Sequence, residues 1–244
     1  MRRGLAAGLV GPAVATALAF VLGLGGQAAG APGPEVIGHS VGGRPIEATQ
    51  VGDPTGERVA LVVGVIHGDE KAGLRVIETI RRSATALEGT QLWLIRVVNP
   101  DGLNSSSRKN ANEVDLNRNF PFRWRPGGKS KGSGYYPGPA PSSEPETKAV
   151  MSFVRRIRPD VSVWYHQDWN AVLACKGRPD DGARYAKLVP MRTSCRGNRL
   201  HGTVVSWQQH AIRGSDAFVV ELAARVSKGQ VKRHARAAIA VAKD

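Results

Sequence analysis

The sequence predicts an α/β fold, a three-layer sandwich in which helices flank a mainly parallel mixed sheet. The first observation is the apolar run at 59–66, which is followed by a polar turn and by a helix with Leu74, Ile77 and Ile80 on one face. Strands that are buried on both faces of a parallel sheet have such a near-continuous run of Val, Ile and Leu. The second observation is that further apolar runs alternate with helical patterns, at 91–98, 161–165 and 218–222.

The other regular elements follow from local signals. Two extended pieces, 36–40 and 45–51, flank a Gly-Gly turn and predict an edge hairpin. The motif SEPE at 143–146 is a capping-box pattern with Pro near the helix start, and the apolar face that follows predicts a helix ending at residue 157. A basic helix is expected at about 230–243.

Two long segments lack a helical or strand period. The motif NPDG at 99–102 indicates a turn, and 103–136 and 168–199 are expected to be irregular. A long connection inside a compact α/β domain is uncommon unless it carries function. The first of these segments is therefore a place to look for functional side chains.

Residues 1–31 are expected to be an export signal in front of one domain at 32–244. Arg2 and Arg3 are the only charged residues before Glu35, and Ala29 and Ala31 suit the −3 and −1 positions of a cleavage site. The alternative is an uncleaved anchor, because the uncharged stretch is long enough to span a bilayer. Its many Gly and Ala residues favour cleavage, so a secreted or envelope-associated protein without stable membrane insertion is expected.

The composition of the whole chain excludes little. The net charge of +14 attracts polyanions, but the basic residues are scattered without a compact run, so nucleic-acid binding is not expected. The two cysteines, Cys175 and Cys195, predict a disulfide in an exported protein. No C-x-x-C motif is present, and a zinc–thiolate cluster is therefore not expected.

Three side chains at predicted strand ends form a candidate metal site. His67 and Glu70 follow the first buried strand and His166 ends another, where ligands bind in open α/β sheets. Two His and one carboxylate, with a position left for water, are the pattern of a catalytic Zn²⁺, here one per chain. Glu221 stands inside an apolar strand, where a carboxylate is costly to bury. It is the candidate general base, and the alternative is a buried partner for an Arg.

Several short motifs are similar, in order and approximate spacing, to those of the zinc carboxypeptidases of the carboxypeptidase A superfamily. The similarity is greater to the compact bacterial branch, the murein peptide amidases. The motifs are HGDE at 67–70, NPDG at 99–102, RK at 108–109, DLNRNFP at 115–121, SEPET at 143–147, and the strand ends with His166 and Glu221. The resemblance covers about residues 36–240, and it implies a zinc-dependent hydrolase of amide bonds.

The resemblance also implies a role for each candidate residue. Asp115 would accept the other ring N–H of His67, while Asn117 and Arg118 would hold the free carboxylate of the substrate. Glu221 would move the proton from the attacking water to the leaving amine, and Arg108 would stabilise the oxyanion. From the residues alone, Arg108 could equally belong to a solvated loop and Asp115 could cap a turn.

The implied substrate is a peptide, and three rival functions remain. The expected bond joins γ-D-glutamate to diaminopimelate in peptidoglycan peptides; the rivals are a general secreted carboxypeptidase, a deacylase of N-acyl amino acids and a non-catalytic wall-binding protein. The larger family members carry a loop tyrosine before the catalytic Glu, which is missing here; His201 is a candidate substitute. A monomer is expected.

Overall fold

The computed structural model describes residue 1 and residues 33–83, 87–126, 133–174, 180–195 and 200–243. Ala31–Asp244 form one compact unit. Nearly all of the expected leader and Cys175 lie outside the described residues, so the export signal and the disulfide stay predictions. None of the helices in the described ranges is both long and apolar enough to cross a membrane.

A seven-stranded sheet forms the centre of the fold. Its order is β1-β2-β4-β3-β5-β6, and β7 also pairs with β5. The strands are β1 (Glu35–His39), β2 (Pro45–Gly52), β3 (Arg58–Val63), β4 (Thr90–Ile95), β5 (Val161–Leu173), β6 (Arg192–Ser194) and β7 (Asp216–Ala223). The hairpin β1–β2 and the pair β2–β4 are antiparallel. All other pairs are parallel, which confirms the predicted mixed, mainly parallel sheet.

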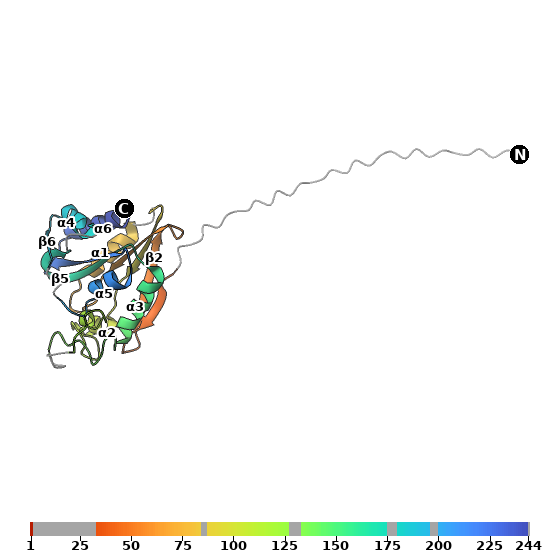
Figure 1. Cartoon of the computed structure of the whole chain (residues 1–244). Helices are drawn as coiled ribbons and strands as arrows, with labels where there is room; N and C mark the ends of the chain where they lie inside the picture. The colour runs from red at the N-terminus through yellow and green to blue at the C-terminus, as the bar shows by residue number, and fades with distance from the viewer. Residues whose placement is uncertain (2–32, 84–86, 127–132, 175–179, 196–199, 244) are drawn as a thin grey trace. The chain divides into compact units, whose positions relative to one another are not determined.

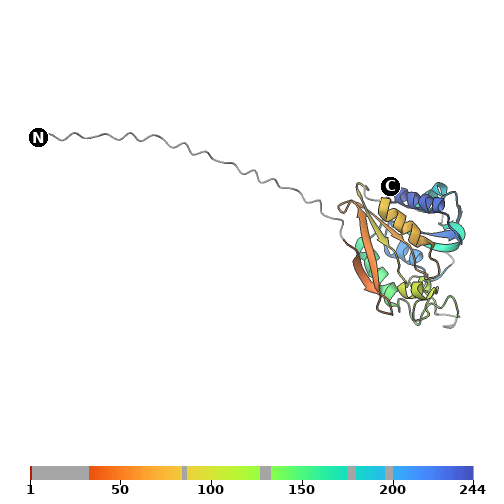
Figure 2. The same ribbon diagram turned by 180° about the vertical axis from the view of Figure 1, so that it is seen from behind.

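Helices cover both faces of this sheet, which confirms the three-layer sandwich. α1 and α6 lie side by side on one face together with α4, and α3 and α5 lie on the other (Figure 1 and Figure 2). The helices are α1 (Ala72–Ser83), α2 (Pro100–Ser105), α3 (Pro145–Ile157), α4 (Asp181–Leu188), α5 (Val204–Ala211) and α6 (Lys228–Lys243), with a short 3-10 helix η1 (Leu116–Arg118).

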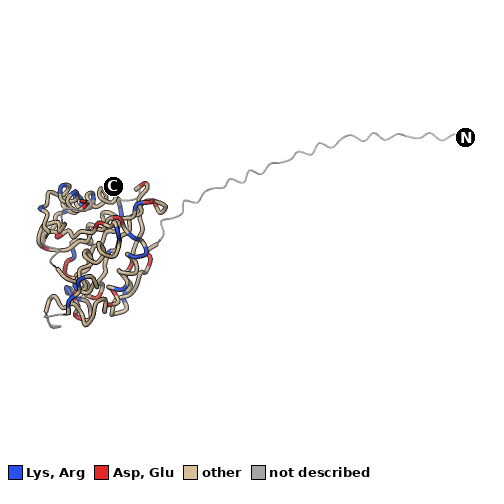
Figure 3. The backbone as a smooth tube through the Cα atoms, viewed as in Figure 1, with Lys and Arg blue, Asp and Glu red and all other residues tan. Residues whose placement is uncertain are grey.

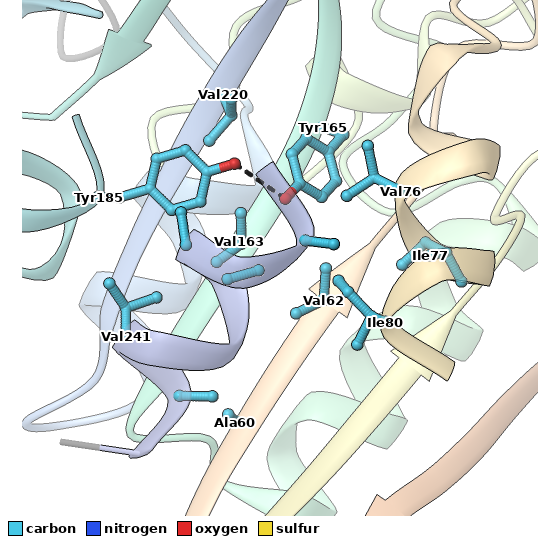
Figure 4. Close-up of a cluster of buried hydrophobic side chains, with 14 of the residues drawn as sticks. Ala60, Val62, Val76, Ile77, Ile80, Val163, Tyr165, Tyr185, Val220 and Val241 are labelled. Carbon is cyan, nitrogen blue, oxygen red and sulfur yellow. Dashed lines mark hydrogen bonds between the residues drawn. The ribbon is translucent and has the colours of Figure 1, made fainter. Parts of the chain in front are cut away.

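Each face of the sheet has its own hydrophobic core. Under α1, α4 and α6, aliphatic side chains of β3, β4, β5 and β7 pack with those of the helices, and Tyr165 and Tyr185 join them through a hydrogen bond (Figure 4). Under α3 and α5, the large rings of Phe120, Trp164 and Trp207 are fully or almost fully buried. Trp164, on the strand predicted at 161–165, is therefore a core residue.

The segment 168–199 was expected to be irregular, and this prediction was wrong. β5 continues past His166 to Leu173, and α4 and β6 follow it. The extension is a strand because its buried, apolar residues 171–173 pair with β6 and also lie beside β7. α5, which no sequence signal identified, begins at the cap Thr203, whose hydroxyl accepts a hydrogen bond from the Ser206 amide.

The predicted turn and capping box also need correction. Residues 99–102 are the start of α2, because the Asn99 side chain accepts a hydrogen bond from the Gly102 amide and caps the helix. α3 is capped at Glu144 without a side-chain cap hydrogen bond, so the capping box does not form. The carboxylate of Glu146 instead accepts a hydrogen bond from the Val41 amide. It therefore connects α3 to the β1–β2 turn.

Candidate active site

The carboxyl ends of β3, β5 and β7 bring together residues that are far apart in the sequence. β5 pairs with β3 on one side, and along β7 its His166 is directly opposite Glu221. The turn after β3 carries His67 and Glu70, both buried. Neighbouring strands are about 4.8 Å apart, so the side chains at these three strand ends share one small region.

His67, Glu70 and His166 form a compact set of ligand atoms. The Nδ1 atoms of the two imidazoles are 3.1 Å apart. One carboxylate oxygen of Glu70 lies 2.8 Å from Nδ1 of His67, and the other lies 2.8 Å from Nδ1 of His166. All three residues are buried, and their ligand atoms lie within 4.8 Å of one another. This is a set that can hold one divalent cation.

The electrostatics of the three residues favour a bound cation. Burial by itself would raise the pKa of Glu70, but the imidazoles of His166 and His67 hold the pKa of this carboxyl far below its ordinary value. Burial by itself would lower the pKa of His67, but the carboxylates of Asp115 and Glu70 raise it. The site therefore keeps an ionised carboxylate beside two imidazoles, and it stabilises positive charge between them.

Asp115 and Arg108 support this set from the loop between β4 and α3. Nε2 of His67 donates to Asp115 at 3.0 Å, which leaves Nδ1 available as a ligand. Nε and Nη2 of Arg108 donate to the other oxygen of Asp115 at 3.1 and 3.0 Å, and its Nη1 donates to Glu70 at 2.9 Å. Burial opposes ionisation of Asp115, yet His67 and Arg108 keep its pKa well below the ordinary value.

Asn117, Arg118 and Tyr135 line the pocket beside the ligand atoms. The amide nitrogen of Asn117 is 3.4 Å from Nε2 of His166, and its oxygen accepts a hydrogen bond from the Val204 amide. The ring of Tyr135 contacts two guanidinium groups, with its centroid 5.1 Å from Cζ of Arg108 and 5.5 Å from Cζ of Arg118. Arg118 forms no ion pair with a carboxylate in the described ranges.

Glu221 is the remaining charged group at the centre of the site. Its side chain is buried, with 8% of the residue exposed, and its Oε2 has no hydrogen-bond partner among the described residues. Burial raises the pKa of this carboxyl, with His166 acting in the opposite direction. The backbone N–H of Trp169 donates a hydrogen bond to this carboxylate, so the cost of burial falls on Oε2, which no described group compensates. Within the described ranges no Arg forms an ion pair with Glu221.

These residues surround a single cavity of about 360 Å³. Its charged and polar wall includes His67, Glu70, Arg108, Asn117, Arg118, His166 and Glu221, and its apolar wall includes Leu173, Leu200, Val205, Ala217 and Val219. Leu200 and Thr203 line the cavity, but His201 does not. A peptide end with one side chain fits a space of this kind.

The structure brings together the predicted ligands, Glu221, Asp115 and the residues at 108, 117 and 118, whereas His201, the candidate substitute for the loop tyrosine, does not line the cavity. Arg108 is not part of a solvated loop, and Asp115 both caps η1 and contacts His67. Two neighbours of the site were missed, Tyr135 and Gln167. The signal for Gln167 was its position directly after His166, whereas Tyr135 stands in a long loop without any periodic pattern.

The comparisons with known proteins decide the family. The family model described as zinc carboxypeptidase matches residues 34–179. The chain belongs to the zinc carboxypeptidase family. It is a hydrolase with the metallocarboxypeptidase fold, and the His-Glu-His set at 67, 70 and 166 lines the cavity described above.

Individual members of the zinc carboxypeptidase family give a finer comparison. Murein peptide amidase A of Escherichia coli K12 is 32% identical over 195 residues, which cover 72% of this chain and 76% of the relative. The crystal structure of the murein-tripeptide amidase of Escherichia coli O157 matches with a TM-score of 0.72 and 25% identity, covering 87% of this chain and 92% of that one. Carboxypeptidase A of Helicoverpa armigera has a TM-score of 0.71, 18% identity and coverage of 87% and 69%, and it shares the fold.

Proposed function

We propose that this zinc carboxypeptidase is an exported, zinc-dependent amidase that acts on peptidoglycan peptides. The bond that it hydrolyses would be the amide next to a residue with a free carboxylate, as in the bond between γ-D-glutamate and diaminopimelate. The observation that carries the catalytic part is the unpartnered Oε2 of Glu221 in the same cavity as three converging ligand atoms. The similarity to two murein amidases supports the substrate class.

The donor set fits zinc. Two imidazole nitrogens and a carboxylate are the ligands of catalytic zinc sites in hydrolases, and the His67 ring is held for this purpose by Asp115. Bound there, zinc would supply a Lewis acid that activates water and polarises the scissile carbonyl. The predicted cofactor is therefore one Zn²⁺ per chain, held by His67, Glu70 and His166.

Glu221 is the general base in this proposal. Burial raises the pKa of this carboxyl, which makes it a stronger base, so it can accept a proton from the attacking water and donate it to the leaving amine. Its place opposite His166 in the sheet puts it beside the metal ligands without making it one. Proton transfer and metal binding are therefore separate tasks of neighbouring side chains.

Arg118 and Arg108 would each bind a different negatively charged group of the substrate. Arg118 has no carboxylate partner in the described ranges, and together with Asn117 it can bind the free carboxylate at the substrate end in a bidentate manner. Arg108 already bonds to Glu70 and Asp115, and it is 24% exposed toward the cavity. From there it can stabilise the oxyanion that forms at the scissile carbonyl.

A substrate panel tests this function. The purified protein is incubated with tri- and tetrapeptide fragments of peptidoglycan and with ordinary peptides that have a free C-terminal carboxylate. We expect release of diaminopimelate-containing products from the wall fragments, and loss of this activity to a chelator that zinc restores. Cleavage of ordinary peptides alone would identify a general secreted carboxypeptidase. Protein that binds wall fragments but does not cleave them even when zinc is supplied would identify a non-catalytic wall-binding protein.

A Glu221→Gln variant tests the base. We expect turnover to fall by at least about a thousandfold, because the amide cannot accept the proton. The bound zinc should stay near one equivalent, because Glu221 is not in the ligand set. Glu113→Gln is the control, since Glu113 is an exposed carboxylate on the loop that carries the site. Full activity of the Glu221 variant would refute this role.

A further inference from the structure

Gln167 makes hydrogen bonds to three separate parts of the active site. Its backbone N–H donates to Oε2 of Glu70 at 3.2 Å. Its side-chain oxygen accepts from the amide of Ala72 at 2.8 Å. Its side-chain nitrogen donates to the carbonyl oxygens of Ala223 and Ala224, at 3.1 and 3.2 Å. One residue thus contacts a metal ligand, the start of α1 and the end of β7.

The bond to Ala72 fixes the segment that carries Glu70. Ala72 is the first residue of α1, and the first amides of a helix have no partner inside it. Such amides are normally capped by a side chain just before the helix. Here the cap comes from β5, across the sheet. The position of α1, and of Glu70 just before it, therefore depends on a residue next to His166.

The bonds to Ala223 and Ala224 fix the segment that carries Glu221. These carbonyls come two and three residues after Glu221, where β7 ends. In the sheet, Gln167 is opposite Leu222, so its side chain reaches past the last pairs of the β5–β7 ladder. It closes the end of the strand that presents the buried carboxylate of Glu221, whose Oε2 has no hydrogen-bond partner among the described residues.

We infer that Gln167 is a positioning residue that holds Glu221 in register with His67, Glu70 and His166. This inference rests on the proposed function, since it assumes that Glu221 transfers the proton. The side chain of Gln167 does not contact a ligand atom; it contacts the two backbone segments on either side of the site. Its loss should therefore change the distance between the base and the ligand set more than the ligand set itself.

Two variants and a matched control test the inference. Gln167→Met keeps the length of the side chain and removes all its hydrogen bonds. Gln167→Glu keeps an acceptor for Ala72 but places a carboxylate against the carbonyls of Ala223 and Ala224. Gln91→Met is the control, because the Gln91 amide also donates to a backbone carbonyl, that of Gly56, in another part of the sheet.

We expect both Gln167 variants to lose about ten- to a hundredfold in kcat while KM changes by less than about threefold, since misplacing a catalytic group slows the chemical step. The acid limb of the pH profile of kcat/KM should also shift along the pH axis, because the surroundings of Glu221 change. Zinc affinity, measured by competition with a chelator, should stay within about tenfold of the parent. The control should keep kcat, KM and the pH profile, although it loses a similar amount of stability.

Three outcomes would overturn the inference. Parental kcat and pH profile in Gln167→Met would exclude a positioning role. Parental kcat in Gln167→Glu alone would reduce the role to capping α1. A loss of kcat fully restored by excess zinc would make Gln167 a residue of metal binding only. If Glu221→Gln is inactive and Gln167→Met is not, only this inference fails; if Glu221→Gln is active, the proposed function fails.

Discussion

At the scale of single residues, Asp115 shows how one carboxylate serves several partners. One oxygen accepts from His67 and from the amide of Asn117, and the other accepts from Nε and Nη2 of Arg108. The side chain is fully buried. The sequence left open whether Asp115 caps a turn or orients a ligand, and it does both. Its negative charge therefore fixes the ring of His67 and the guanidinium of Arg108 together.

The variant Asp115→Asn should weaken metal binding. An amide cannot balance the charge of Arg108, and it accepts a weaker hydrogen bond from His67, so we expect zinc affinity to fall by about 10- to 100-fold. Competition with a chelator measures this change. Asp69→Asn is the matched control, because Asp69 is an exposed carboxylate in the same turn as His67. Equal zinc affinity of the two variants would contradict the role of Asp115.

The sequence was sufficient to predict the candidate site residues that lie at or near the ends of strands. His67, Glu70, His166 and Glu221 follow or interrupt apolar runs, and parallel strands must end at the same edge of a sheet. Tyr135 could not be found in this way. Its place between Arg108 and Arg118 depends on the path of a long loop, and only the tertiary structure fixes that path.

At the scale of elements, the turn after β3 is held against α2 by a contact between two glycines. A Cβ on Gly68 would lie 1.9 Å from the carbonyl carbon of Gly102 and 2.2 Å from its oxygen. Both neighbours are backbone atoms and have little freedom to move. The absence of a side chain at Gly68 is therefore what allows His67 and Glu70 to lie next to α2.

The variant Gly68→Ala should disturb both stability and the metal site. We expect a loss of about 1–3 kcal/mol in the free energy of unfolding, as for other overpacked sites, together with weaker zinc binding. Chemical unfolding and chelator competition measure the two effects. Gly33→Ala is the control, since a Cβ at Gly33 has no neighbour within 4 Å. A parental zinc affinity in Gly68→Ala would show that the turn tolerates displacement.

Elements were predictable where the local pattern was strong. The β1–β2 hairpin, α1, α6 and the buried strands match their predicted positions to within a few residues. The extension of β5, and β6, were missed because polar residues interrupt the apolar run after His166 and β6 is short and polar, so that these strands are defined by pairing. The capping box failed because Glu146 bonds to Val41, a residue more than a hundred positions away.

At the scale of the whole molecule, a buried polar chain crosses one of the two cores. The hydroxyl of Tyr165 is 2.9 Å from that of Tyr185 (Figure 4). The Tyr185 hydroxyl is in turn 2.8 Å from Nδ1 of His234 on α6. Burial, with a contribution from Arg233, lowers the pKa of His234 to about 4. The basic residues themselves are spread over many elements, as expected from the sequence (Figure 3).

The buried imidazole should make stability depend on pH. The unfolded chain binds this proton below pH 6.5, the ordinary pKa, whereas the folded chain resists it until about pH 4. The contribution of neutral His234 to the free energy of unfolding is therefore complete above pH 6.5. As the pH falls from 6.5 toward 4, the free energy of unfolding decreases by about 3 kcal/mol. Denaturant unfolding at pH 7 and pH 4.5 should give a smaller difference for His234→Gln than for the parent. His39→Gln, at an exposed position, should keep the parental difference.

The pairing of β3 with β5 has a consequence for the order of assembly. Glu70 is translated more than ninety residues before His166, and the two side chains come together through the pairing of β3 with β5 and the bond from the Gln167 N–H to Glu70. A nascent chain that stops before residue 161 contains His67 and Glu70 but lacks His166, so it would bind an ion only weakly. Capture of the proposed zinc ion would therefore be a late event, and zinc uptake during refolding would report completion of the central strands.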